Sequence, residues 1–392
     1  MEGDFIKLNK NLLPLSWLYG LGVKFRNMLF DMNILKSRSY SVPVISVGNI
    51  TVGGTGKTPH VEYIIQLLKD QFRVAMLSRG YKRKSSWYVL ATTETPMKMI
   101  GDEPYQIKQK YPMVTVAVDA KRTRGIEHLI HDDGTKETDV IVLDDAFQHR
   151  YVKPGVNILL VDYHRSIIFD KLIPVGRLRE PLKGKDRADI VIVTKCPKNL
   201  KPMEFRVLTK QMNLYPYQQL FFTTLDYGQL KPVFPATRIP VRCLEDLTDY
   251  HVLLLTGIAS PMQIYYDVKP HAKDIKTLAY GDHHAFKHAD VHHINETFAG
   301  MPSPKVIITT EKDMVRLEIT EGLSDEVKKN LLMLPVKISF MQNGEESFNE
   351  KIIGYVRKNS RNSILAKGKD DHKSQDRDYS GDRPRTIVFR NN

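Results

Sequence analysis

Several features common in other protein classes are scarce in this chain of 392 residues. It contains only two cysteines, Cys196 and Cys243, which are too few for a disulfide framework and do not have the spacing of a zinc site. No apolar run reaches the roughly 18 residues that a membrane-spanning helix requires, and the first residues lack the cleavage pattern of a secretory signal. We therefore expect a cytoplasmic protein in a reducing compartment.

Acidic residues are outnumbered by basic ones. The chain has 58 Lys and Arg against 45 Asp and Glu, a formal net charge of +13, within an otherwise ordinary globular composition. This excess predicts an anionic partner, which could be a nucleotide, a phosphorylated substrate, an acidic lipid surface or a nucleic acid. No zinc-finger spacing, RNP-like aromatic stretch or helix-turn-helix pattern is present, so we expect no nucleic acid partner.

The first 36 residues combine apolar and basic side chains in an unusual way. Leucines and aromatic residues such as Trp17 and Phe25 alternate with Lys7, Lys10 and Lys24. Such a composition is typical of a helix that lies in a membrane interface, with its basic residues near lipid phosphates. A helix that packs on the core of its own protein can have the same composition. The sequence leaves both interpretations open.

The remainder of the chain alternates short β-branched runs with helix-like stretches. Because nearly continuous apolar character is typical of strands covered on both faces, these runs predict a largely parallel α/β sheet flanked by helices. Together with the glycine-rich sequence Gly53-Gly54-Thr55-Gly56-Lys57-Thr58 after the first run, they predict a P-loop NTPase-like fold. The predicted strands are 42–47, 74–77, 114–118, 140–143, 156–161, 190–193, 252–255 and 306–308. The predicted segments are an amphipathic membrane-interacting segment (1–36), a core domain (37–215), an extended ribbon (216–250), a smaller α/β domain (251–357) and a disordered polar tail (358–392).

A glycine-rich loop follows the first predicted strand. The glycines allow backbone N–H groups to surround phosphate oxygens at the N-terminus of the following helix, which Val61, Ile64, Ile65 and Leu68 predict by their spacing. We expect Lys57 to reach the β- and γ-phosphates of a nucleotide and the Thr58 hydroxyl to bind Mg²⁺. Thr51 occupies the position of the usual first glycine. The predicted nucleotide-binding residues are Thr51, Val52, Gly53, Gly54, Thr55, Gly56, Lys57 and Thr58.

Asp144 and Asp145 end the predicted strand 140–143. Carboxylates are hard oxygen ligands that suit Mg²⁺, and a P-loop needs such a ligand at the adjacent edge of the sheet. We therefore expect one of these two aspartates to contact the metal. Gln148 and His149 follow them and are expected to line the same cleft as substrate-binding residues.

These motifs, taken in order, resemble the tetraacyldisaccharide 4'-kinases, the lipid A disaccharide kinases of Gram-negative bacteria. The resemblance extends from about Leu12 to Leu317. It implies transfer of the γ-phosphate of ATP to the 4'-hydroxyl of an acylated glucosamine disaccharide 1-phosphate, on the cytoplasmic face of the inner membrane. It also implies that the opening helix binds the anionic membrane surface, and it suggests no obligate protein partner. The motifs are Pro43–Asn49, Leu77–Tyr81, Gly101–Pro104, Leu143–Arg150, Gly176–Pro181, Gly281–His284 and Thr309–Asp313.

The resemblance also implies roles for individual residues. The general base of the family matches Asp102, and the histidine that assists it matches His283. A carboxylate is suited to accept the proton of a sugar hydroxyl as the hydroxyl attacks phosphorus. Arg122 and Arg179 are expected to neutralise phosphate charge, because guanidinium groups pair well with phosphate oxygens. Glu180 is expected to help hold Mg²⁺.

One alternative with the same loop is a P-loop GTPase or ATPase switch, or a metallochaperone. A guanine-reading Asn-Lys-x-Asp motif is absent, since Thr194-Lys195-Cys196-Pro197 lacks the acidic residue. The sequence therefore favours ATP over GTP. A second alternative, a nucleic-acid-binding module, has only the net positive charge in its favour.

Overall fold

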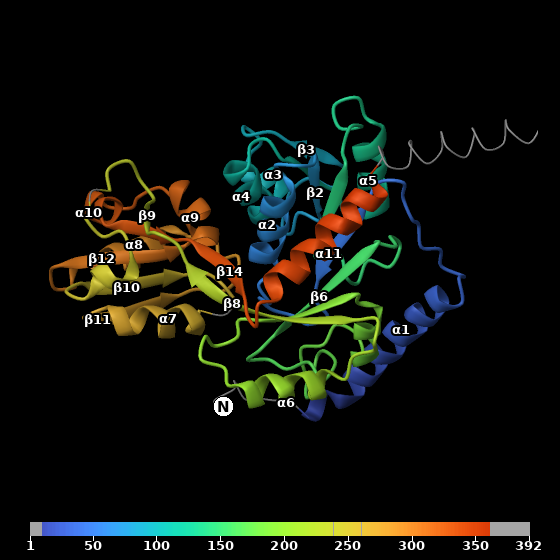
Figure 1. Cartoon of the computed structure of the whole chain (residues 1–392). Helices are drawn as coiled ribbons and strands as arrows, with labels where there is room; N and C mark the ends of the chain where they lie inside the picture. Colours follow the sequence, from blue (N-terminus) through green and yellow to red (C-terminus); the bar gives the residue numbers. More distant parts are fainter. Residues whose placement is uncertain (1–9, 238, 260, 361–392) are drawn as a thin grey trace, which may run out of the picture.

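The computed structural model describes residues 10–237, 239–259 and 261–360. Residues 1–9 of the predicted N-terminal segment lie outside this range, as does the predicted tail apart from its first three residues. The described chain forms two β-sheets, a nine-stranded one and a five-stranded one, each with helices packed against it. Figure 1 shows them as two lobes that are joined by β8 and β14.

The nine-stranded sheet contains the glycine-rich loop. Neighbouring strands run parallel except at the two edges, where β3 and β14 are antiparallel to their neighbours. The strands in sheet order are β14 (Val336–Phe340), β8 (Gln219–Tyr227), β7 (Ile190–Thr194), β6 (Val156–Asp162), β1 (Val44–Gly48), β5 (Val140–Asp144), β2 (Val74–Ser78), β4 (Thr115–Val118) and β3 (Val89–Ala91).

Helices cover both faces of this sheet. On one face, buried side chains of α2, α3, α4 and α11 form a single cluster with alternate strand residues such as Ile45 and Met76. On the other face, α5 and α6 pack against the remaining strand residues, such as Leu77 and Leu159. The helices are α2 (Lys57–Leu68), α3 (Met97–Ile100), α4 (Asp102–Lys110), α5 (Arg122–His131), α6 (Pro202–Met212) and α11 (Gly344–Asn359), with a 3-10 helix, η2 (Leu182–Arg187).

The five-stranded sheet lies beside the first and is also mostly parallel, with only β9 antiparallel. Its strand order is β11 (Asp274–Ala279), β10 (His251–Thr256), β12 (Lys305–Thr310), β13 (Leu331–Leu334) and β9 (Lys231–Pro232). The helices packed with it are α7 (Met262–Val268), α8 (His288–Ala299), α9 (Glu311–Glu318) and α10 (Asp325–Lys329), with the 3-10 helices η3 (Leu244–Leu247) and η4 (Lys269–His271).

The predicted fold class is confirmed. Each of the eight predicted apolar runs forms a strand, and the helix expected behind the glycine-rich loop is α2, in which Val61, Ile64, Ile65 and Leu68 are all buried. The edge strand β11 was not predicted. All of its residues are exposed or half-buried, so it lacks the continuous apolar pattern that marks a strand covered on both faces.

The segment predicted to be an extended ribbon is only partly a connection. β8 is an integral strand of the nine-stranded sheet, where it pairs in parallel with β7. On its other side β8 pairs with β14, from Tyr227 opposite Val336 to Thr223 opposite Phe340. The chain therefore returns to the first sheet after completing the second, and α11 packs on the first sheet although it lies within the predicted C-terminal domain. The division of the chain into the five predicted segments stays a prediction.

The helix α1 (Leu13–Asp31) follows a 3-10 turn, η1 (Lys10–Leu12), and lies against the nine-stranded unit. It contacts the body through hydrogen bonds, in which Ser16 donates to the carbonyl of Leu172 and Arg26 donates to that of Gln148. Near its end, the buried ring of Phe30 packs against Tyr151. The apolar side chains of α1 mostly point away from the protein. The exposed ones are Leu13, Leu15, Trp17, Leu18, Leu21, Phe25 and Met28, with Met32 and Ile34 just beyond the helix.

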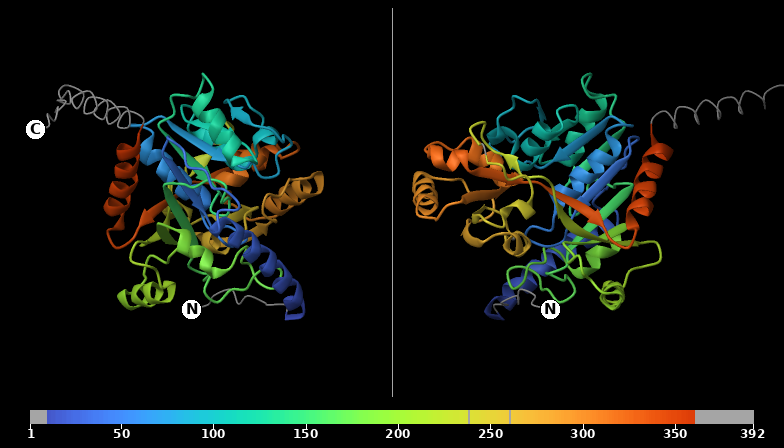
Figure 2. Two further views of the ribbon diagram at one scale, coloured as in Figure 1. Left: turned by 90° about the vertical axis from the view of Figure 1, so that its right-hand side faces the viewer. Right: turned by 60° about the vertical axis from the view of Figure 1, so that its left-hand side comes forward.

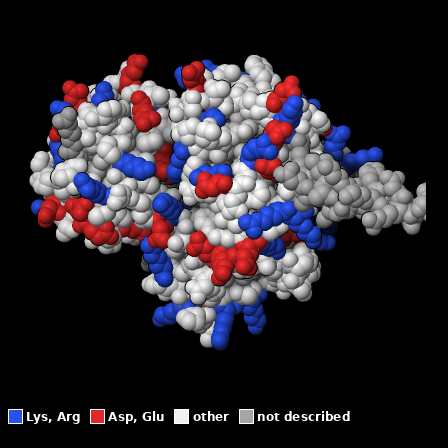
Figure 3. Space-filling view, turned by 45° about the horizontal axis from the view of Figure 1, so that its top comes forward, with Lys and Arg blue, Asp and Glu red and all other residues white. Residues whose placement is uncertain are grey.

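In the described part of the chain, no helix is both long enough and apolar enough to cross a bilayer. The turned views in Figure 2 show α1 at the periphery of the molecule, apart from the five-stranded lobe. On the face drawn in Figure 3, basic and acidic side chains are interspersed over most of the surface. That face therefore lacks a single large basic patch of the kind that is typical of nucleic-acid-binding proteins.

Candidate active site

The glycine-rich loop lies between β1 and α2, in the middle of the nine-stranded sheet. Gly53 and Gly56 adopt left-handed backbone conformations (φ of 112° and 81°), which L-residues with a side chain rarely adopt, and Gly56 caps α2. Thr51 forms a short bridge with Leu178 and does not have a positive φ. A glycine is therefore not required at that position, which explains how the loop forms without the usual first glycine.

Two buried groups hold the loop from behind. Lys195 donates a hydrogen bond to the carbonyl of Gly54 and forms an ion pair with Asp162 at 2.8 Å. Thr194 donates to the carbonyl of Thr55 at 3.0 Å. Both residues lie at the end of β7, so the adjacent strands fix the shape of the loop. The sequence does not indicate that Thr194 and Lys195 support the loop, because they lie more than 130 residues from it along the chain.

His60 forms a third support for the loop. Its ring is 2% exposed, and its Nδ1 lies 2.7 Å from the carbonyl oxygen of Gly56 while its Nε2 lies 3.0 Å from the hydroxyl of Thr223 in β8. Because a carbonyl can only accept, Nδ1 carries the proton, and Nε2 accepts from Thr223. Burial lowers the pKa of His60 to about 4.

We expect the His60 ring to remain neutral from pH 5 upwards. A histidine in the unfolded chain titrates near pH 6.5, so protonation favours the unfolded state as the pH falls from about 6.5 to about 4. The stabilising contribution of His60 is therefore complete above that window and is lost within it. An NMR titration of the histidine rings, assigned with the His60→Gln variant, should place its midpoint near 4. A midpoint above 6 would contradict this account.

The loop opens into a cavity of about 710 Å³ that is lined by residues of both lobes. The nine-stranded unit contributes the loop, Asp144, Asp145, Gln148 and Arg179, whereas the five-stranded unit contributes Asp282, His283 and residues 310–312. A cavity of this size is typical of a small-molecule binding site. Its lining combines apolar surface with many charged side chains, which suits a charged ligand.

Asp145 forms ion pairs with two basic residues of the cavity, Lys57 and Arg179. Lys57 Nζ lies 3.7 Å from Asp145 Oδ1, and Arg179 NH1 lies 3.4 Å from Asp145 Oδ2. Burial alone would raise the pKa of Asp145, but Lys57, Arg179 and Arg122 lower it. Arg179 is held next to the loop because its backbone N–H donates to the carbonyl of Ile50 at 2.8 Å.

Asp144 ends β5, directly opposite Val47 at the end of β1. Its Oδ2 accepts from the Ser78 hydroxyl at 3.0 Å, whereas its buried Oδ1 has no hydrogen-bond partner among the described residues. Burial, together with the nearby charges of Glu103 and Asp145, raises the pKa of Asp144 to about 7. A buried carboxylate oxygen without a partner is suited to a bound cation.

The donor set fits Mg²⁺ better than zinc. The described residues contain no group of three or more His, Cys, Asp and Glu side chains that could hold a metal. Mg²⁺ does not require such a cage, because it binds P-loop proteins through a hydroxyl, a carboxylate, phosphate oxygens and water. Thr58 at the start of α2 and Asp144 would supply the hydroxyl and the carboxylate.

Five of the predicted site residues do not line the cavity: Thr51, Asp102, Arg122, His149 and Glu180. The Glu180 carboxylate pairs with Arg187, at 2.8 and 2.9 Å. The Arg122 side chain is buried and donates to the carbonyls of Asp119 and Asp144, at 3.1 and 3.0 Å. Burial, together with nearby arginines, lowers the pKa of His149 to about 4. Arg122 nevertheless contacts a cavity-lining residue, through the backbone carbonyl of Asp144.

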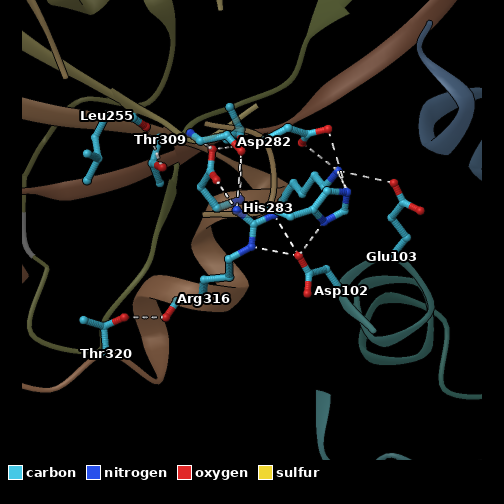
Figure 4. Close-up of polar contacts among 12 residues, drawn as sticks. Asp102, Glu103, Leu255, Asp282, His283, Thr309, Arg316 and Thr320 are labelled. Atoms are coloured by element: carbon cyan, nitrogen blue, oxygen red, sulfur yellow. Dashed lines mark hydrogen bonds and ion pairs between the residues drawn. The ribbon is translucent and has the colours of Figure 1, made fainter. Parts of the chain in front are cut away.

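At the far side of the cavity, Asp102 at the start of α4 meets residues of the other lobe (Figure 4). Its Oδ2 lies 3.0 Å from His283 Nδ1 and accepts from Arg316 Nε at 2.8 Å. Burial alone would raise the pKa of Asp102, but the hydrogen bonds and charges of His283 and Arg316 lower it to about 2. Asp102 is therefore an ionised carboxylate at neutral pH. It does not itself line the cavity, which His283 and Glu103 reach.

Further ion pairs join the lobes next to this contact. Lys110 of α4 pairs with Glu62 of α2 at 2.5 Å and with Glu311 of α9 at 2.8 Å. Lys312 lies 3.3 Å from Glu103. The sequence showed no sign of Lys110 or Arg316, because a charged residue on a helix is usually a solvated one. Lys312 and Glu311, in contrast, lie within the recognised motif Thr309–Asp313.

The mostly parallel sheet, the loop before α2 and the aspartate at the end of the adjacent strand define a P-loop phosphotransferase. The family model described as Tetraacyldisaccharide-1-P 4'-kinase matches residues 8–357. The chain belongs to this family, and it is a kinase.

Known proteins are similar to the chain over nearly its whole length. A tetraacyldisaccharide 4'-kinase of Phocaeicola vulgatus is 57% identical, over 93% of this chain and 99% of that protein. One from Bacteroides thetaiotaomicron is 51% identical, over 95% of this chain and 100% of that protein. A crystal structure of LpxK from Aquifex aeolicus in complex with ATP is 30% identical and superimposes with a TM-score of 0.66, over 88% of this chain and 98% of that one. These relatives are kinases, and no observation favours a switch protein or a metallochaperone.

Proposed function

We propose that this chain transfers the γ-phosphate of ATP to the 4'-hydroxyl of a tetraacylated glucosamine disaccharide 1-phosphate, with Asp102 as the proton acceptor. The family and its named relatives support the reaction. The observation that carries the assignment of the site is one cavity lined by the phosphate-binding loop and by His283, whose Nδ1 lies 3.0 Å from Asp102 Oδ2.

ATP is proposed to place its phosphates in the loop 51–58, where backbone N–H groups and the N-terminus of α2 favour negative charge. The ammonium of Lys57 and the guanidinium of Arg179 reach the same space. Thr58 and Asp144 would hold Mg²⁺, with Asp145 beside them. When bound, the metal neutralises charge on the phosphate oxygens.

The proton of the sugar hydroxyl is proposed to move to Asp102. His283 Nε2 lies 3.1 Å from Lys312 Nζ. Because an ammonium can only donate, Nε2 is the accepting nitrogen and Nδ1 carries the proton, which it donates to Asp102. The imidazole in this state has no free nitrogen to act as a base, so it orients the carboxylate and Asp102 takes the proton.

The sugar substrate is proposed to enter on the side of α1. Two cavity-lining residues, Gln148 and Arg179, are also contacts of α1, since the Gln148 carbonyl accepts from Arg26 and the Arg179 carbonyl accepts from Tyr19 at 2.6 Å. Arg179 and the nearby Arg79 supply positive charge for phosphate groups. A lipid held in a membrane under α1 would thus lie beside the entrance to the cavity.

We propose that the outward apolar side of α1 binds the membrane surface. Trp17 is 78% exposed and Leu18 is 67% exposed, although burying such side chains in an apolar environment is worth about 1.5–3 kcal/mol each. The net positive charge favours an anionic bilayer. The family implies the cytoplasmic face of the bacterial inner membrane as the place of contact.

Replacing Trp17, Leu18, Leu21 and Phe25 by Ser should lower the affinity for anionic vesicles at least about tenfold, since each change removes part of that burial energy. Sedimentation with vesicles that contain phosphatidylglycerol measures this affinity. The matched control replaces Met203 and Val207, two exposed apolar residues of α6, and should bind as the wild type does. If the α1 variant partitions fully onto vesicles, the proposed contact is wrong.

The direct test of the reaction is incubation with γ-labelled ATP and the disaccharide 1-phosphate in mixed micelles. Label should appear on the 4'-position of the sugar and depend on Mg²⁺. GTP should serve poorly as a donor, as expected of a kinase rather than a guanine-nucleotide switch. Hydrolysis of ATP at the same rate with and without the sugar, and no labelled lipid, would overturn the proposal.

A further inference from the structure

Arg316 is a buried arginine of α9 that reaches across to the other lobe (Figure 4). Its Nε donates to Asp102 Oδ2 at 2.8 Å, and its NH2 lies at the same distance from that oxygen. Guanidinium–carboxylate contacts of this kind are charge-assisted and directional. The carboxylate proposed as the proton acceptor is therefore held by a residue of the five-stranded unit.

The guanidinium group of Arg316 is held in place by residues of its own lobe. Its NH1 donates to Asp313 Oδ1 at 3.0 Å and lies 3.4 Å from the carbonyl oxygen of Gly257. Asp313 is fully buried, and its Oδ2 accepts from the Gly257 N–H at 2.8 Å and from the Thr310 hydroxyl at 2.7 Å. Each oxygen of Asp313 is therefore engaged, and Arg316 has little freedom to turn away from Asp102.

Arg316 and His283 contact the same oxygen of Asp102. His283 Nδ1 lies 3.0 Å from Oδ2, the oxygen that also accepts from Arg316. No residue in the described ranges donates a hydrogen bond to Oδ1. One carboxylate oxygen is thus anchored by two donors, and the other keeps its lone pairs for a further partner.

We propose that Arg316 is a positioning residue that anchors Asp102 through Oδ2, so that Oδ1 is the oxygen that receives the proton of the 4'-hydroxyl. This inference rests on the proposed function. In the step, the O–H bond of the sugar breaks and its proton passes to Asp102 Oδ1, while the sugar oxygen forms a bond to the γ-phosphorus. The bond from that phosphorus to the β,γ-bridging oxygen breaks, and ADP leaves with the electron pair.

The contact between Arg316 and Asp102 makes the proposed proton transfer depend on how the two lobes are arranged. Arg316 belongs to the five-stranded unit and Asp102 to the nine-stranded one. Asp102 is therefore oriented only while the lobes are together. ATP binding, in contrast, uses the loop and depends little on Arg316. Loss of Arg316 should consequently lower kcat and leave the KM for ATP nearly unchanged.

The test compares Arg316→Met, which keeps an unbranched stem but removes the guanidinium group, with Arg316→Lys, which keeps the charge. Loss of a hydrogen bond to a charged group typically changes a rate about tenfold to a hundredfold. Arg316→Met should therefore lower kcat about tenfold to a hundredfold. The KM for ATP should stay within about twofold of wild type. Arg316→Lys should recover part of the loss. The control Arg73→Met removes an exposed ion pair with Asp139 and should leave kcat unchanged.

A double-variant cycle shows whether Arg316 acts through Asp102. The variant with both Arg316→Met and Asp102→Asn should be no slower than Asp102→Asn alone, because the orientation of a missing base has no effect. If the two losses multiply, or if kcat and the KM for ATP worsen together with the melting temperature, Arg316 is a structural residue and the inference is wrong. If Asp102→Asn alone has no effect, the proposed function fails instead.

Discussion

Replacing Asp102 by Asn should lower kcat at least about a hundredfold, because general-base catalysis contributes roughly 10²–10⁴-fold. The amide keeps the shape of the side chain but has no basic oxygen that could take the proton. Binding of ATP should remain within a few-fold of wild type, since Asp102 belongs to α4 and neither forms part of the loop 51–58 nor lines the cavity. Steady-state kinetics with the disaccharide 1-phosphate measure kcat. Calorimetry measures the affinity for ATP.

A second aspartate–histidine pair provides a matched control for this variant. Asp290 lies 2.9 Å from His284 Nε2 in the same five-stranded unit as His283, but neither residue lines the cavity. Asp290→Asn should therefore leave kcat near the wild-type value. If Asp102→Asn weakened ATP binding as much as it slowed transfer, Asp102 would be a structural residue of α4 and not the proton acceptor.

Replacing Lys57 by Met should lower kcat about a hundredfold to a thousandfold, the loss found when a positioned donor to developing charge is removed. The Lys57 side chain is largely buried and its only ion pair is the 3.7 Å contact with Asp145, within the described residues. Its ammonium is therefore aimed at the space for phosphates. Because Lys57 lowers the pKa of Asp145, the pKa of that carboxyl should also rise in the variant.

The control for Lys57 is Lys185→Met. The Lys185 side chain is similarly buried and pairs with Asp186 at 3.2 Å, but it does not line the cavity. That variant should retain kcat and ATP affinity. A Lys57→Met protein that still phosphorylated the sugar at a rate near wild type would show that the loop is not the phosphate-binding element.

The sequence predicted the parts of the fold that depend on local pattern. Strands buried on both faces appear as short apolar runs, and a helix of period 3.6 follows the loop, so both could be recognised. The spacing of Gly53 and Gly56 before Lys57 matches the backbone that a phosphate-binding loop requires. Asp144 was found because strands that run parallel end at one edge of the sheet.

The parts that depend on contacts between distant segments were not predictable in this way. β14 pairs with β8 across more than a hundred residues of sequence, and only the completed sheet brings them together. Arg316 is an ordinary helix residue until α9 packs beside α4. Glu180 follows Arg179 in sequence, yet its carboxylate pairs with Arg187 and not with the groups around Asp144. No local signal distinguishes these cases.

The pairing of β8 with β14 has a consequence for how such a chain can be assembled. At the end of this pair the N–H of Gly228 donates to the carbonyl of Pro335 at 2.9 Å. The polypeptide thus leaves the larger sheet and re-enters it at neighbouring points. The segment 229–334 is therefore inserted into the larger sheet at one place, between β8 and β14. Replacing this segment by a tight turn would join β8 and β14 as a hairpin and leave every strand of the nine-stranded sheet intact.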